Sequence, residues 1–310
     1  MSSLASESSM RPDLSTAKIA GAPISWGVCE VPGWGRMLDV HTVLGEMAEL
    51  GLPATELGPP GYLPEQPAEL SALLDRYGLR LVGGFLAAVL HDPDQVWSTM
   101  DDVADVVELL SAVGGEVLVL AAATGRDSYD VRPQLPDEHW RTLLATACRI
   151  RDLAARKGLR TVLHPHAGTH VERKAEVERF LADSDLPLCV DTGHLLIGGT
   201  DPVELVRRHP DRVGHVHLKD VRAAIADVVR AGQITYTHAV GTGMYVPLGD
   251  GDINLPALIR LLVEAGYDGW YVLEQDTVLP GGSTAGDDRP RRDTARSLAH
   301  LNTFLSWSPR

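Results

Sequence analysis

Short apolar, β-branched segments alternate along the chain with longer segments whose apolar residues recur every three to four positions. The short segments predict eight strands, at residues 19–24, 53–57, 80–86, 116–121, 159–164, 186–191, 212–218 and 270–274. The longer segments predict helices at residues 37–49, 67–77, 96–112, 137–157, 171–182, 202–209 and 255–265, with a final helix at 293–306. Strict alternation of strands and helices predicts a parallel sheet, and eight strands favour its closure into a (β/α)8 TIM barrel.

The positions of the glycines support this α/β pattern, because a glycine follows several predicted helices just before the next strand, as at Gly51, Gly78 and Gly158. Glycine at that place suits the left-handed residue that ends a helix. A doubly wound open sheet is the alternative. No GxGxxG motif follows the first strand and the chain has no P-loop, so the usual nucleotide signatures of that alternative are missing.

The length of 310 residues fits one barrel domain, expected at residues 18–310. Residues 1–17 are rich in serine and lack the basic start and apolar run of a signal peptide, so we expect a disordered leader. The widest gap between strands, at about 222–253, predicts a loop-rich insertion between strands seven and eight that covers the mouth of the barrel. Residues 278–293 form another predicted loop.

Composition narrows the possible partners. Apolar residues make up 44% of the chain, enough for a sizeable core, and the net charge of −14 disfavours nucleic acid and anionic membranes. No run approaches the roughly 20 apolar residues that span a bilayer. Cys29, Cys148 and Cys189 lie far apart, which is typical of reduced thiols. We therefore expect a cytoplasmic protein acting on a small molecule, and a homo-oligomer remains possible.

Ionisable side chains stand at the ends of the predicted strands, where the active site of such a barrel is built. In chain order they are Glu56, His164, His166, Asp191, His194, His215, His217, Lys219, Asp220 and Glu274. Such groups are costly to bury unless they are paired or bound to a metal. Carboxylates and imidazoles from separate strands suit Mn²⁺, Co²⁺ or Zn²⁺, and the absence of cysteine among them disfavours a structural zinc site.

Each of these residues also has a plainer interpretation. A single histidine at a strand end is more often a hydrogen-bonded structural residue, and Asp191 followed three residues later by His194 is compatible with an ordinary helix cap. Trp26 and Tyr62 are more often packing residues than substrate platforms. In the HVH segment, alternation places His215 and His217 on one face, and His217, nearer the strand end, is the better ligand. The joint pattern favours a metal site.

Several motifs resemble the xylose-isomerase-like superfamily of sugar isomerases, epimerases and related lyases, over about residues 18–305. They are VDTGH at 190–194, HVHLKD at 215–220, GDGDI at 249–253 and LE at 273–274. Within that superfamily the chain is most similar to inosose dehydratase, which eliminates water from 2-keto-myo-inositol. That likeness is carried by TELGPPGYLP at 55–64, HPHAGTHVE at 164–172, DTGHLLIGGTDP at 191–202 and LEQD at 273–276.

The resemblance implies one divalent ion, with Mn²⁺ or Co²⁺ favoured and Zn²⁺ possible, on Asp191, His217 and Glu274. The fourth ligand would come from strand five, where many superfamily isomerases have glutamate before proline and this chain has His164-Pro165, with His166 as the other choice. Paired glutamates suit epimerases, whereas a dehydratase needs a base and an acid, for which histidines are well suited. This difference favours a lyase.

The candidate catalytic residues are His166, His194 and Glu56, with the order of acid and base left open. Trp26, Lys219 and Asp220 are expected to line the site for a polyol-derived ketone. Two alternatives remain: a metal-dependent isomerase or epimerase of a ketose or hydroxy-ketone, and a non-catalytic sugar-binding barrel. An AP-endonuclease-like activity is disfavoured, because the acidic chain lacks basic tracts that could hold phosphates.

Overall fold

A computed structural model describes residues 17–305 except 30, 32, 127 and 282–287, so the predicted leader falls almost wholly outside it. In this part of the chain nine parallel strands form one sheet in the order β3-β2-β1-β11-β8-β7-β6-β5-β4. The strands are β1 Lys18–Gly21, β2 Ala54–Thr55, β3 Arg80–Leu81, β4 Gly83–Ala88, β5 Val117–Ala122, β6 Arg160–Leu163, β7 Leu188–Asp191, β8 Val213–Leu218 and β11 Trp270–Leu273.

The two strands at the ends of that order are halves of a single barrel strand, interrupted at Val82. The N–H of Val82 donates to the carbonyl of Thr55 at 2.9 Å, and its carbonyl accepts from the N–H of Glu116 at 2.7 Å. Val82 therefore joins β2 on one side to the start of β5 on the other. The ring closes with eight strands, as the sequence predicts, and the barrel prediction is confirmed.

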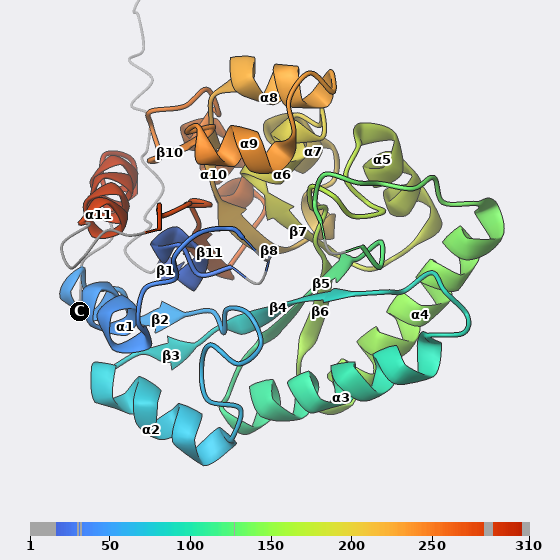
Figure 1. The fold of residues 1–310 in the computed structure, drawn as a ribbon, viewed down its shortest axis with the longest axis horizontal. Coiled ribbons are helices and arrows are strands. Elements are labelled where there is room, and N and C mark those ends of the chain that lie inside the picture. The colour runs from blue at the N-terminus through green and yellow to red at the C-terminus, as the bar shows by residue number, and fades with distance from the viewer. Residues whose placement is uncertain (1–16, 30, 32, 127, 282–287, 306–310) are drawn as a thin grey trace, which may run out of the picture.

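Helices surround the central strands (Figure 1). They are α1 Val40–Glu49, α2 Pro67–Tyr77, α3 Val96–Ala112, α4 Asp137–Arg156, α5 Lys174–Asp183, α7 Pro202–Arg208, α10 Leu255–Glu264 and α11 Arg289–Leu301. Helix α1 begins three residues later than predicted, because the Asp39 carboxylate caps it by accepting from the N–H of His41. The predicted final helix at 293–306 is shifted, since α11 begins at Arg289 and ends at Leu301.

The segment 222–253, predicted as a loop-rich insertion, contains turns and loops but also regular elements. The segment holds α8 (Ala223–Arg230), α9 (Tyr236–Gly241) and β10 (Tyr245–Val246), which pairs antiparallel with β9 (Asp220–Val221). Helix α8 has a clear apolar face, on which Ile225 and Val229 pack beside buried Ala226, but it is only eight residues long, which gives a short periodic signal in the sequence. A short helix directly after β7, α6 (Thr192–Ile197), was also not predicted as such.

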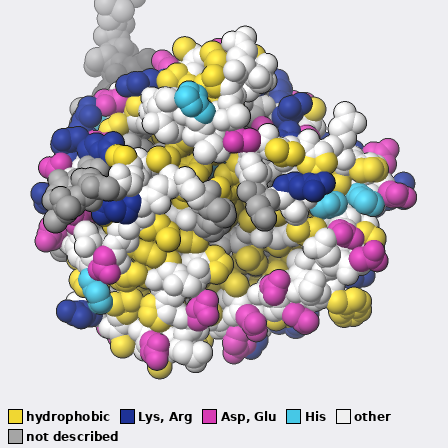
Figure 2. Space-filling model, in the orientation of Figure 1, with side chains coloured by type: hydrophobic (Ala, Val, Ile, Leu, Met, Phe, Trp, Pro, Cys, Tyr) yellow, Lys and Arg dark blue, Asp and Glu magenta, His cyan; other side chains and the backbone are white. Residues whose placement is uncertain are grey.

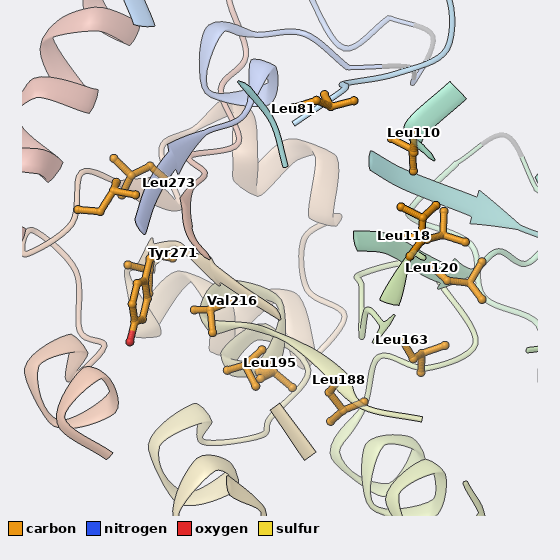
Figure 3. Close-up of a cluster of buried hydrophobic side chains, with 14 of the residues drawn as sticks. Leu81, Leu110, Leu118, Leu120, Leu163, Leu188, Leu195, Val216, Tyr271 and Leu273 are labelled. Carbon is orange, nitrogen blue, oxygen red and sulfur yellow. The ribbon is translucent and has the colours of Figure 1, made fainter. Parts of the chain in front are cut away.

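Alternation along the strands separates two apolar layers. Leu118, Leu120, Leu163, Leu188 and Val216 face outward and pack with the helices in the main core. Figure 3 shows these side chains around the ring of strands, together with Leu110 of α3 and Leu195 of α6. A smaller inward cluster fills one half of the barrel with Val117, Val119, Val162 and Cys189, against which Phe85 packs. Every second strand residue therefore points to the barrel axis.

Candidate active site

The same alternation places the predicted site residues inside the barrel. His164 follows outward-facing Leu163, Asp191 follows outward-facing Val190, and His217 lies between Val216 and Leu218, both of which belong to the outer core. Glu274 comes directly after Leu273 at the end of β11. Because parallel strands end at the same rim, these side chains meet at one place.

Asp191, His217 and Glu274 form one of three groups of possible metal ligands in the described part of the chain; the others are Glu56, His215 and His217, and His164, Cys189 and His217. The ligand atoms of the first group lie within 4.8 Å of one another. Nδ1 of His217 lies 3.1 Å from Oε2 of Glu274 and 3.6 Å from Oδ2 of Asp191. All three residues are buried, with Asp191 completely so.

The fit of these residues to a cation rests on the orientation of the His217 ring. Its Nε2 lies 3.1 Å from Oε1 of Glu56, and because an ionised carboxylate only accepts, Nε2 carries a proton. Nδ1 faces two carboxylates and has no hydrogen-bond partner among the described residues. Burial lowers the pKa of His217, but Cys189, Glu274 and Glu56 raise it well above the usual value, so without an ion the ring holds a second proton on Nδ1, which a bound ion would replace. A divalent ion bound by one imidazole nitrogen and two carboxylate oxygens would satisfy all three groups, so the residues present fit the metal implied by the motifs.

Glu56 holds the His217 ring by Nε2, the nitrogen that does not face Asp191 and Glu274. Its Oε1 accepts from Nε2 of His215 at 2.8 Å as well as from His217, so both histidines of the HVH segment turn toward one oxygen. Burial opposes ionisation of Glu56, but the charge of His217 and the two hydrogen bonds hold its pKa well below the usual range. A carboxylate that holds the far nitrogen of a ligand histidine is a common companion of metal sites.

His164 contacts the group without belonging to its tight core. Its Nε2 lies 3.3 Å from Oδ2 of Asp191, and its ring centroid lies 5.0 Å from that of His217. It is not part of the 4.8 Å group of Asp191, His217 and Glu274, but it forms a separate group with Cys189 and His217. The structure brings His164 to the place expected of the fourth ligand, and its ligation stays a prediction.

His166 and His194 lie in close ring contact, with centroids 3.8 Å apart. Nδ1 of His166 lies 2.7 Å from the carbonyl of Ala167, which can only accept, so the neutral His166 ring has its lone pair on Nε2. Nδ1 of His194 accepts from the N–H of Ala167 at 3.3 Å, so the neutral His194 ring has its proton on Nε2. Burial, aided by His164 and Lys219, lowers the pKa of His166 to about 3, which keeps that ring neutral.

Three carboxylates surround the ammonium group of Lys219. Nζ lies 2.9 Å from Oε2 of Glu274, 3.6 Å from Oδ2 of Asp191, and in direct contact with Oδ1 of Asp276. Burial disfavours the charged lysine, but Asp276, Glu274 and Asp191 together raise its pKa well above the usual value. Lys219 is therefore a permanent buried cation beside the candidate metal site.

These groups open onto a cavity that both polar and apolar residues line. The polar side chains that line it are Glu56, His164, His166, His217, Lys219, Glu274 and Asp276. The apolar and aromatic lining includes Pro23, Ile24, Val28, Trp34, Phe85 and Tyr129. On the face shown in Figure 2, apolar side chains gather around the centre and charged ones lie mostly toward the edge.

Two of the residues expected to line the substrate site lie elsewhere. Trp26 is fully buried in the main core, where its indole N–H donates to Oε2 of Glu46 on α1 at 2.7 Å. Asp220 is buried under the segment 249–253, and neither side chain is part of the cavity lining. Lys219, the third of these residues, does line the cavity.

Asp220 instead organises the GDGDI segment. Its carboxylate accepts from the backbone N–H groups of Gly249, Gly251 and Ile253 at 2.8, 3.0 and 3.1 Å, and from Val221 at 2.9 Å. A Cβ atom at Gly251 would lie 2.2 Å from Oδ1 of Asp220, so this close approach requires glycine. The motif therefore has a structural reason to exist beside the site.

Sequence analysis did not single out Asp276, Tyr236 or Tyr245, which meet next to Lys219. Asp276 was visible in the LEQD motif, two residues after Glu274, on the same face by alternation. The two tyrosines lie in the segment 222–253, where no sequence motif pointed to the site. Only the position of α9 and β10 in the fold brings them there.

Comparison with known proteins agrees with this geometry. A model of the xylose isomerase-like TIM barrel family matches residues 44–303. The chain belongs to this family. Among curated members of it, an inosose dehydratase from Geobacillus kaustophilus is 34% identical over 278 residues, covering 86% of this chain and 90% of the relative. A rhizopine catabolism protein from Rhizobium meliloti is also 34% identical, over 277 residues that cover 86% of this chain and 83% of that protein.

Solved structures of xylose isomerase-like barrels share the fold at low sequence identity. An L-ribulose 3-epimerase superposes with a TM-score of 0.68 at 16% identity, covering 94% of this chain and 95% of that one. The probable 3-DHS dehydratase from Bacillus anthracis gives a TM-score of 0.65 at 16% identity, with coverages of 92% and 98%. No helix in the described part of the chain has the length and apolar character needed to cross a membrane.

Proposed function

We propose that this protein is a divalent-metal-dependent hydro-lyase that eliminates water from a ketocyclitol such as 2-keto-myo-inositol, with a role in inositol catabolism. The observation that carries the proposal is the orientation of His217, which turns one nitrogen to Glu56 and the other to Asp191 and Glu274. The relatives named inosose dehydratase support the reaction class and the substrate.

The ion, with Mn²⁺ or Co²⁺ favoured, would be held by Asp191, His217 and Glu274, with His164 as the fourth ligand. When bound, it would polarise the ketone of the substrate. Glu56 fixes the tautomer of His217, so we assign it a supporting role in place of direct proton transfer.

We assign proton transfer to His166. His166 lines the cavity, and its bond to the Ala167 carbonyl leaves Nε2 free to take the proton from the carbon next to the ketone. The imidazolium formed in this way can give the same proton to the departing hydroxyl, which leaves as water. His194 contacts the His166 ring but does not line the cavity, and burial and His166 lower its pKa well below the usual value, so we assign it a supporting role beside His166. Lys219 offers a fixed positive charge to the substrate oxygens.

The test uses protein stripped of metal and reloaded with Mn²⁺ or Co²⁺, incubated with 2-keto-myo-inositol. Loss of water gives a conjugated enone, so ultraviolet absorbance should rise with time. Asp191→Asn should abolish both bound metal and turnover. Asp185→Asn, which changes a carboxylate that is 82% exposed and pairs with Arg151, should leave both unchanged.

The outcomes separate the alternatives. No absorbance change with any divalent ion would refute the dehydratase. Solvent deuterium entering one carbon of the recovered substrate, without loss of water, would support an epimerase. Unchanged metal content in Asp191→Asn would refute the metal assignment itself.

A further inference from the structure

The carboxylate of Asp276 joins the cavity to the segment that sequence analysis could not interpret. Its Oδ1 contacts Nζ of Lys219, and its Oδ2 accepts from the hydroxyl of Tyr236 at 2.7 Å. All three residues are buried. Both oxygens of Asp276 are thus engaged, one by a cation of the cavity and one by a tyrosine of α9.

Asp276 is the partner on which Lys219 depends. Of the three carboxylates around its ammonium group, Asp191 and Glu274 are the proposed ligands of the divalent ion. A divalent ion bound to those oxygens would offset their negative charge, and the attraction of Asp191 and Glu274 for the Lys219 ammonium group would be weaker. Asp276 is not one of these proposed ligands, although its Oδ2 also lies 3.9 Å from Nε2 of His194. A lysine side chain on its flexible four-carbon stem needs a fixed counter-ion to keep one direction.

Tyr236 is itself held in place by its surroundings. Its hydroxyl lies 3.1 Å from that of Tyr245, and because Tyr236 gives its only proton to Asp276, Tyr245 must be the donor between them. Gly193 leaves the space for this contact, since a Cβ atom there would lie 2.8 Å from both Cβ of Lys219 and the Tyr245 ring. The Thr235 hydroxyl caps α9 just before Tyr236.

We propose that Tyr236 is a positioning residue of the active site: its hydroxyl fixes Asp276, which holds the Lys219 ammonium group toward the substrate cavity. This inference rests on the proposed function for the identity of the substrate, and on the contacts above for the arrangement itself. It gives helix α9 a role in the chemistry, although α9 supplies no metal ligand.

The first test compares Tyr236→Phe with Tyr267→Phe. Each variant removes one hydroxyl that donates a hydrogen bond, but Tyr267 donates a part-buried one to the carbonyl of Trp270, at the opposite end of β11 from Glu274. We expect Tyr236→Phe to lower kcat by at least about tenfold, with little change in KM, because a displaced charge is felt most in the transition state. Its affinity for Mn²⁺ should equal that of the wild type, and Tyr267→Phe should keep kcat.

Two results would overturn the proposal. In one, Tyr236→Phe retains wild-type kcat and KM. In the other, it loses Mn²⁺ affinity in step with kcat, which would mean that Tyr236 acts on the metal ligands and not on Lys219.

A second test does not depend on the substrate. The chain has four lysines, Lys18, Lys157, Lys174 and Lys219, so acylation of each by a small activated acetate ester can be followed by peptide mass spectrometry. Relative to the exposed Lys157 and Lys174, Lys219 should react faster in Tyr236→Phe than in the wild type or in Tyr267→Phe. Equal Lys219 reactivity in all three proteins would refute the positioning role. If wild-type protein fails to turn over any ketocyclitol, the proposed function fails, and Lys219 reactivity still decides the role of Tyr236.

Discussion

Replacing Glu56 by glutamine tests whether this buried carboxylate supports the metal site or acts on the substrate. One oxygen of Glu56 accepts from His215 at 2.8 Å and from His217 at 3.1 Å. In Glu56→Gln the neutral amide oxygen accepts weaker hydrogen bonds than the carboxylate does, and the NH2 group can only donate. The side chain of His217 is therefore held less firmly in its orientation.

The expected loss follows from the geometry. His217 keeps its own ligand nitrogen but loses the carboxylate that fixes its tautomer, a change that typically lowers metal affinity by about 10- to 100-fold. At about 1.4 kcal/mol for each tenfold change, the loss is about 1.4 to 2.8 kcal/mol of binding free energy. It should be measured by competition for Mn²⁺ or Co²⁺ with a chelator of known affinity.

Glu116→Gln is the matched control. One oxygen of Glu116 likewise accepts two N–H groups, from Arg80 at 3.1 Å and from the Trp270 indole at 3.2 Å, but Glu116 lies just before β5, at the other end of the barrel. It should leave metal affinity unchanged. If Glu56→Gln binds metal as tightly as the wild type while kcat collapses, the supporting role is refuted and Glu56 acts directly on the substrate, as the sequence first indicated.

Three further predictions concern stability. Leu118→Ala, in the layer between strands and helices, should reduce the free energy of unfolding by about 2–5 kcal/mol in urea titrations. The control Trp97→Ala, at a side chain 78% exposed, should change the free energy of unfolding by less than about 0.5 kcal/mol. Equal losses in the two variants would refute the layer assignment. Asp220→Ala should cost at least about 2 kcal/mol, because it strips several backbone N–H groups of their acceptor, without weakening Mn²⁺ binding; a weaker metal site in a fully stable variant would contradict this. Burial, reinforced by His91 and Arg132, lowers the pKa of His170 from 6.5 to about 4; the unfolded chain therefore binds the proton first, and stability is lost as pH falls from 6.5 toward 4. His170→Gln should flatten this part of the pH dependence, and an unchanged slope would argue against it.

The fold and the candidate metal ligands were accessible to sequence analysis, because strand ends follow from local periodicity and the resemblance to the xylose-isomerase-like superfamily selects residues among them. Alternation alone places Asp191 inward after outward Val190, and His217 inward between two core residues. The convergence of strand ends in a closed barrel then brings them together. Those inferences need no knowledge of side chains far away in the sequence.

The partners of these residues were not accessible in the same way. Glu56 hydrogen-bonds to His217, 161 positions later in the chain, and no local sequence pattern indicates which strand end will face Glu56. Trp26 was a candidate for the substrate site, but an aromatic residue after a first strand can face either way, and Glu46 on α1 supplies the indole partner that keeps it in the core. Tyr236 stands on a six-residue helix too short for a clear periodic signal.

The spread of the proposed ligands and of Glu56, which supports them, along the chain also bears on how the protein is made. Glu56 follows the second barrel strand, and the proposed ligand Glu274 follows the last, whose pairing with β1 closes the ring. During synthesis, a chain that has not yet emerged from the ribosome as far as β11 lacks both Glu274 and the pairing of β11 with β1. Such a chain has no complete set of the proposed ligands. Ion capture at the proposed site would therefore belong to the end of biogenesis, and bound metal would report a finished barrel.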